Sequence, residues 1–187
     1  MNHPKSKPYL SVRQLCAAAL GAAVISICSW ITIPAAVPFT LQTFAVCLVT
    51  GLLGLKCGIF SVIVYLLLGA VGIPVFSGFT GGIGHLLGST GGYLIGFIFT
   101  AIVVGLCVGK WGRKIPVLAA GMVLGIALCY VFGTAWFMLV YTRANGPTAL
   151  GLVLGWCVTP FLIPDAIKIF LAIILVNRLS GHLPRTE

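Results

Sequence analysis

The fold depends most on residues 43–75, which read TFAVCLVTGLLGLKCGIFSVIVYLLLGAVGIPV. Lys56 is the one charged residue in this block, and it lies in the short interruption GLKCG (54–58). Because a helix needs about 20 apolar residues to cross the hydrocarbon core, the block is too long for one span. We therefore expect two shortish helices that meet at a turn around Lys56.

The rest of the chain is equally apolar. Of its 187 residues, 60% are hydrophobic and 7% are charged, and the mean hydropathy is +1.17. A water-soluble domain of this size could not cover its surface with so few charges. The sequence predicts an all-α integral membrane protein with six transmembrane helices, forming a single domain over residues 1–187 in the lipid bilayer.

Prolines and glycines set the other expected boundaries. Pro34 and Pro38 end the first helix and leave residues 34–42 as an extended, uncharged connection. Seven glycines in residues 77–92 argue against a stable helix there, so this segment is expected to fold over protein or line a cavity. Helices are expected at about 13–33, 93–109, 115–141 and from 164 onward, with a half-helix at 149–158. Three segments, 34–42, 77–92 and 159–165, then converge as structured loops on the outer face.

The positive charges follow the pattern of a multi-pass membrane protein. The net charge is +9, and most basic residues fall in alternate connections or at the termini: Lys5, Lys7, Arg13, Lys56, Lys110, Arg113, Lys114, Arg178 and Arg185. This positive-inside pattern predicts a multi-pass membrane protein with cytoplasmic tails at 1–12 and 179–187. The basic residues form no stripe interleaved with aromatics, so nucleic acid is not an expected partner.

Asp165 is the most unusual residue, because the only other acid is the terminal Glu187. It lies in PFLIPDAIK (160–168), one helical turn before Lys168. Ionisable groups at membrane depth are costly and usually line a polar cavity or pair with each other. A structural ion pair is the alternative, since an acid in the first turn also complements the helix dipole. In the functional interpretation, Lys168 binds an anionic group and Asp165 accepts a hydrogen bond from an N–H donor.

Gln42, Thr40 and Thr43 lie where the first outer loop becomes a helix. Threonine is a common helix cap, so a structural role is open. Alternatively, Phe39 and Gln42 form a lid that buries an apolar ligand and hydrogen-bonds its polar edge. Both interpretations stand at this point.

The glycine segment contains Gly82, Gly84 and Gly88 at a spacing that does not match a nucleotide-binding fingerprint. Glycines in membrane segments often allow close helix packing. This segment is too rich in glycine for packing alone, so we favour a backbone wall that fits closely against a small ligand.

The first helix carries AAALGAA at residues 17–23. Ala18 and Ala22, like Ala19 and Ala23, have the spacing of small residues that lets another helix approach closely. Internal packing and docking of a partner membrane protein are both compatible with this pattern.

The sequence contains no catalytic or metal-binding constellation. Seven cysteines are scattered through apolar segments without a C-x-x-C pair, and three histidines are too dispersed for a zinc site. An intramembrane enzyme would need a nucleophile with a base, and a channel would need polar stripes along several helices. We therefore expect a binding or transport protein without catalytic residues, metal or cofactor.

Three stretches resemble the BioY family: PFTLQT (38–43), GIPVFSGFTGGIGHLLGSTGGYLIGF (72–97) and PFLIPDAIK (160–168). The resemblance covers essentially the whole chain in order. Family members are biotin-specific S components, the substrate-binding subunits of energy-coupling-factor (ECF) transporters. Ser89 departs from the proline that the family usually has before T-G-G-Y, and no polar site group is lost.

The resemblance implies a six-helix S component in a bacterial cytoplasmic membrane that captures biotin from outside with high affinity. A transmembrane coupling protein and cytoplasmic ATPases would power its release inward, since the chain has no Walker loop of its own. It implies that Asp165 and Lys168 bind biotin and that Ala18, Ala19, Ala22 and Ala23 face the coupling protein. The candidate substrate-binding residues are Asp165, Lys168, Gln42, Phe39, Thr40, Gly82, Gly84, Thr90 and Tyr93. An S component for another small vitamin and a solitary biotin facilitator remain alternatives.

Overall fold

The computed structural model describes residues 11–34 and 37–181. Most of the two expected tails therefore lies outside the described residues. The helices are α1 (Val12–Trp30), α2 (Gln42–Ala70), α3 (Ile83–Leu87), α4 (Gly91–Trp111), α5 (Ile115–Asn145), α6 (Leu150–Cys157) and α7 (Leu162–Leu179). Two short strands, β1 (Thr32–Ile33) and β2 (Phe39–Thr40), and a 3₁₀ turn at Thr159–Phe161 complete the described elements.

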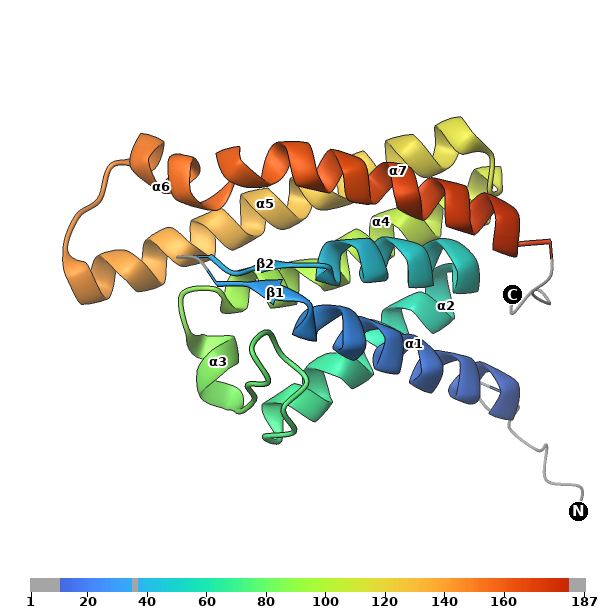
Figure 1. The fold of residues 1–187 in the computed structure, drawn as a ribbon, viewed down its shortest axis with the longest axis horizontal. Coiled ribbons are helices and arrows are strands. Elements are labelled where there is room, and N and C mark those ends of the chain that lie inside the picture. The colour runs from blue at the N-terminus through green and yellow to red at the C-terminus, as the bar shows by residue number, and fades with distance from the viewer. Residues whose placement is uncertain (1–10, 35–36, 182–187) are drawn as a thin grey trace, which may run out of the picture.

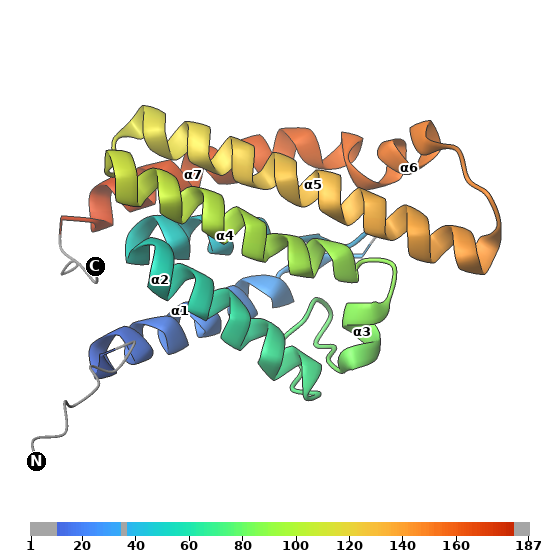
Figure 2. The same ribbon diagram turned by 180° about the vertical axis from the view of Figure 1, so that it is seen from behind.

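The long helices lie side by side in one elongated bundle (Figures 1 and 2). In the described part of the chain, five stretches have the length and composition to cross a membrane: α1, α2, α4, α5 and the stretch Leu150–Leu179 that joins α6 to α7. The expected half-helix before the last span is present as α6. Asp165 lies in the first turn of α7, as the sequence predicts.

The expected break within residues 43–75 is present at Gly54. Its φ of 78° and ψ of −174° are not helical, and the chain doubles back there (Figure 1). Glycine adopts this left-handed conformation at little steric cost. We call residues 42–53 the first half of α2 and residues 55–70 its second half. The halves are in close contact, because a Cβ on Gly58 would lie 2.8 Å from Thr50 Cγ2.

The bundle has two chemically different ends. The start of α1, the break in α2, the α4–α5 connection and the end of α7 lie at one end, which we call the basic end (Figure 1). Six of the eight lysines and arginines in the described residues lie in these segments or within two residues of them: Arg13, Lys56, Lys110, Arg113, Lys114 and Arg178. The connection after α2, helix α3 and the α5–α6 connection lie at the opposite end, the loop end.

Two expectations for the loop-end segments need correction. The first helix ends at Trp30 and not at Ile33, because β1 pairs antiparallel with β2 and aligns Thr32 with Thr40. The glycine-rich segment 77–92 is not wholly irregular, since its glycine-poor centre forms the short helix α3. Helix α4 accordingly begins at Gly91, earlier than expected.

Glycines bring α4 and α5 close together. A Cβ on Gly92 would lie 2.2 Å from Trp136 Cβ, and a Cβ on Gly133 would lie 2.3 Å from Tyr93 Cδ1. Such small residues let membrane helices approach closely and pack an aromatic ring against the facing backbone. The ring of Tyr93 is therefore held in place by the backbone of α5.

Candidate ligand-binding site

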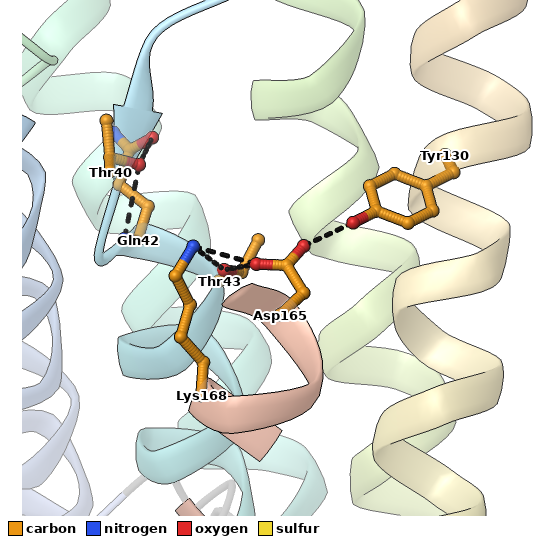
Figure 3. Close-up of polar contacts among 6 residues, drawn as sticks. All are labelled: Thr40, Gln42, Thr43, Tyr130, Asp165 and Lys168. Atoms are coloured by element: carbon orange, nitrogen blue, oxygen red, sulfur yellow. Dashed lines mark hydrogen bonds and ion pairs between the residues drawn. The ribbon is translucent and has the colours of Figure 1, made fainter. Parts of the chain in front are cut away.

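The site is built around the ion pair on α7. The Asp165 and Lys168 side chains lie on one face because they are three residues apart in a helix. Lys168 Nζ lies 2.7 Å from Asp165 Oδ1 (Figure 3). Asp165 is 3% exposed and Lys168 6% exposed, even though the bundle has few other polar groups to solvate them. Burying such a pair is favourable only if further hydrogen bonds satisfy both groups.

Two other helices supply these hydrogen bonds. Thr43, at the start of the first half of α2, donates to Asp165 Oδ1 at 3.0 Å and accepts from Lys168 Nζ at 3.2 Å. Tyr130 of α5 donates its hydroxyl proton to Asp165 Oδ2 (Figure 3). The carboxylate thus accepts three hydrogen bonds, and a carboxylate can accept about four. One acceptor position remains for a ligand.

Strand β2 covers the lysine. Lys168 Nζ lies 4.9 Å from the centroid of the Phe39 ring, a distance at which the ring quadrupole attracts the cation. Phe39 in turn stacks on Phe161, with the ring centroids 4.8 Å apart. Phe39, an expected residue of the lid, therefore lies over Lys168 and is stacked on the turn that precedes α7.

Gln42 is buried and bonded at both ends of its amide. Thr40 Oγ1 donates to Gln42 Oε1 at 3.1 Å, and Gln42 Nε2 donates to the hydroxyl of Tyr65 in the second half of α2. Thr40 Oγ1 also accepts from the Gln42 backbone N–H at 3.3 Å, so this threonine also serves the helix start. Thr40 thus has a structural role at the start of α2, and the expected role of Gln42 in a lid over the ligand stays a prediction.

Two adjoining cavities lie beneath β2. The first extends between the ion pair and Tyr93, and its wall includes Cys129, Tyr130, Cys157 and Phe161. The second lies toward the loop end, where Ser77, His85 and Thr90 contribute polar groups. The cavities share six lining residues: Val37, Pro38, Thr40, Gln42, Tyr93 and Phe97. Mostly apolar walls with a few placed polar groups are typical of small-molecule sites.

The structure brings most of the candidate residues together. Asp165, Lys168, Gln42, Thr40 and Tyr93 line the first cavity, and Thr90 lines the second. Phe39 covers Lys168 without lining either cavity.

Gly82 and Gly84 do not line either of these two cavities, and a Cβ on either would meet nothing within 4 Å. Gly82 instead has a φ of 103° where the chain enters α3. Their expected role as a close-fitting backbone wall stays a prediction.

Tyr130 and Tyr65 are site residues that sequence reasoning missed. Both lie inside long apolar helices, where a tyrosine is usually read as part of the core. A buried tyrosine hydroxyl needs a hydrogen-bond partner, and here the partners come from other parts of the bundle. The two tyrosines can therefore be recognised as site residues only when the helices are assembled. Asp165 and Gln42 are those partners.

The alanines of α1 divide between two faces, which corrects the expected docking face. Ala18 and Ala22 are 3% and 1% exposed. They lie on the same face of α1 as Gly21, where an added Cβ would lie 2.3 Å from Ser61 Oγ of α2. Ala19 and Ala23 are exposed. Ala18 and Ala22 thus pack inside the chain and cannot contact a partner directly.

Among the described residues, no group of three histidine, cysteine or acidic side chains is placed to hold a metal ion. The long apolar helices are those of a multi-pass membrane protein, and a mostly apolar cavity with a few polar groups lies between them. The chain matches the BioY family over residues 2–185, and it belongs to that family.

Relatives support this assignment along most of the chain. A biotin transporter BioY of Thermotoga maritima is 40% identical over 170 residues, which cover 90% of this chain and 96% of the relative. BioY2 of Lactococcus lactis subsp. cremoris, also described as a biotin transporter, is 42% identical over 176 residues, covering 90% and 91%. The probable biotin transporter BioY of Pyrococcus horikoshii is 40% identical over 146 residues, covering 78% and 82%.

A solved structure shares the fold. It is the crystal structure of the S-component for biotin from an ECF-type ABC transporter, and it superposes with a TM-score of 0.81 at 30% identity. The match covers 91% of this chain and 92% of the solved one.

Proposed function

We propose that this chain is the biotin-binding S component of an ECF-type ABC transporter and serves the uptake of biotin. The observation that carries the proposal is the buried Asp165–Lys168 pair, with its bonds from Thr43 and Tyr130, beside a mostly apolar cavity. The family membership and the shared fold support the same conclusion.

The chemistry of biotin suits this cavity. Its ureido group presents N–H donors beside a carbonyl acceptor. The ion pair offers the open acceptor position on Asp165 Oδ2 and the one N–H of Lys168 Nζ that bonds neither Asp165 nor Thr43. We propose that one ureido edge bonds both groups, and the expected contact of Lys168 with an anionic group of the ligand stays the alternative. The thioether ring and chain would then lie along Tyr93 and Phe97, with the carboxylate toward the second cavity.

The chain would act as a non-catalytic subunit. It has no Walker loop, so ATP-driven uptake would need partner ATPases and a transmembrane coupling protein. Uptake of labelled biotin into proteoliposomes tests this function, with the chain alone and with its ATPase module. We expect ATP-dependent accumulation only with the module. Accumulation by the chain alone would favour a solitary facilitator, and no accumulation in either case would reject the uptake role.

We expect the chain to cross the membrane six times, with both termini in the cytoplasm. The reversal at Gly54 divides α2 into two crossings. The basic end then faces the cytoplasm, as the positive-inside rule favours. In a variant without native cysteines, Asn145→Cys should react with an impermeant thiol reagent from outside and Lys114→Cys only from inside. Lys114 is chosen over its neighbour Gly112, whose φ of 78° disfavours a side chain. Reaction of both positions from the same side would contradict this topology.

We expect the exposed alanines of α1 to contact the coupling protein. Ala19→Leu and Ala23→Leu should leave biotin binding unchanged and impair ATP-driven uptake, because leucine would hold a partner helix away. Ala120→Leu, at an exposed position of α5, is the matched control and should transport normally. Unchanged uptake in both α1 variants would remove the docking role from this face.

A further inference from the structure

Arg113 reaches from the α4–α5 connection onto the end of the first half of α2. Its Nε donates to the Gly51 carbonyl and one Nη to the Leu52 carbonyl, both at 2.9 Å. The last carbonyls of a helix have no partner within the helix, and a positive charge there also complements the helix dipole. The planar guanidinium can serve two carbonyls at once, which a lysine cannot do with the same geometry.

This contact is not explained by the positive-inside pattern alone. That pattern requires charge at the basic end, and the neighbouring Lys110 and Lys114 supply it from exposed positions. Arg113 instead is half-buried and directed at backbone carbonyls of another helix. Its side chain therefore has a specific structural partner.

The half-helix that Arg113 holds also carries the site. It spans residues 42–53, so its two ends are only about 17 Å apart at 1.5 Å per residue. Its first turn supplies Gln42 and Thr43, and Thr43 bonds both members of the ion pair. Glycine at position 54 interrupts the helix next to the held carbonyls, so the backbone there does not by itself fix the position of the half-helix.

We propose that Arg113 is a positioning residue for the ligand site: by holding the basic end of the half-helix, it sets the position at which Thr43 meets Asp165 and Lys168. The test of this proposal by biotin binding rests on the proposed function. The geometry makes the half-helix a rigid link between the basic end of the bundle and the cavity. A change at the α4–α5 connection is thereby transmitted to the site.

The test compares purified Arg113→Met, Arg113→Lys and Lys114→Met. We expect Arg113→Met to weaken labelled-biotin binding about tenfold, because two hydrogen bonds from a charged donor are lost. Arg113→Lys should have a smaller effect, because it keeps the charge and loses the paired geometry. Lys114→Met removes a neighbouring exposed charge and should bind like the unchanged protein. If Arg113→Met does not fold, Arg113→Lys carries the test.

A double-mutant comparison with Thr43→Val separates positioning from a general loss of stability. If Arg113 acts through Thr43, the combined variant should bind no more weakly than the weaker-binding single variant, because both changes remove the same interaction. Multiplied losses of affinity, or normal binding by folded Arg113 variants, would overturn the proposal.

A measurement that does not use biotin tests the role of Arg113 independently of the proposed function. Backbone amide hydrogen exchange in residues 42–53 should increase in Arg113→Met and not in Lys114→Met, while α4 and α5 stay protected. Increased exchange throughout the bundle, or none in the half-helix, would contradict the positioning role. Failure of the unchanged protein to bind biotin would reject the proposed function and leave this measurement to decide on Arg113.

Discussion

Asp165→Asn is expected to weaken biotin binding by roughly ten- to a hundredfold, since each charge-assisted hydrogen bond is worth roughly 1.5–3 kcal/mol. The amide keeps the shape of the carboxylate, but only its oxygen still accepts, so the bonds from Thr43, Lys168 and Tyr130 cannot all persist. Lys168→Met should weaken binding by a similar factor, because it removes the donor next to that acceptor. Equilibrium binding of labelled biotin to the purified variants measures both effects.

The double variant separates a ligand site from a structural ion pair. Breaking a buried pair leaves one charge unpaired, so each single change should also lower the thermal stability. Combining Asp165→Asn with Lys168→Met removes both charges and should recover part of that stability. If the pair binds the ligand, affinity stays low in the double variant. Near-normal binding there would instead identify the pair as purely structural.

Gly133→Val is expected to abolish measurable biotin binding and to lower the melting temperature. A Cβ at this position would lie 2.3 Å from Tyr93 Cδ1, and Tyr93 lines both cavities and is hydrogen-bonded to Thr134 at 3.0 Å. The valine must displace the ring or separate α4 from α5, and overpacking of this kind costs about 1–3 kcal/mol. Thermal unfolding and biotin binding are measured on the same preparation.

Gly155→Val is the matched control for this change. Gly155 lies in α6, and a Cβ added there would meet nothing within 4 Å, so a valine at this position tests helix propensity without the clash. Adding Tyr93→Ala to Gly133→Val should restore part of the melting temperature, because the colliding ring is gone. A Gly133→Val protein that melts and binds normally would show that the ring is not held by this contact.

The sequence predicts the membrane class and the charged centre of the site well. Few acids and long apolar blocks allow only a membrane bundle, and Asp165 is conspicuous because a buried acid in lipid needs a partner. Lys168 follows from helical spacing alone. The break at Gly54 is also predictable, because residues 43–75 exceed one span.

The remaining features depend on tertiary packing. Tyr130 and Tyr65 look like core residues until the neighbouring helices bring Asp165 and Gln42 to their hydroxyls. In α1, the same small-residue spacing occurs on two adjacent faces, and only the packing of Gly21 against Ser61 determines which face is internal. For the same reason, the charge pattern placed Arg113 at the basic end but could not predict that it contacts the end of a helix.

The most direct test of the account is equilibrium binding of labelled biotin to the purified chain, with unlabelled biotin, thiamine and riboflavin as competitors. We expect one saturable site from which biotin displaces the label and the other two vitamins do not. We also expect Asp165→Asn to weaken this binding while the protein remains folded. Absence of saturable binding, displacement of the label by thiamine or riboflavin, or unchanged affinity in folded Asp165→Asn would contradict it.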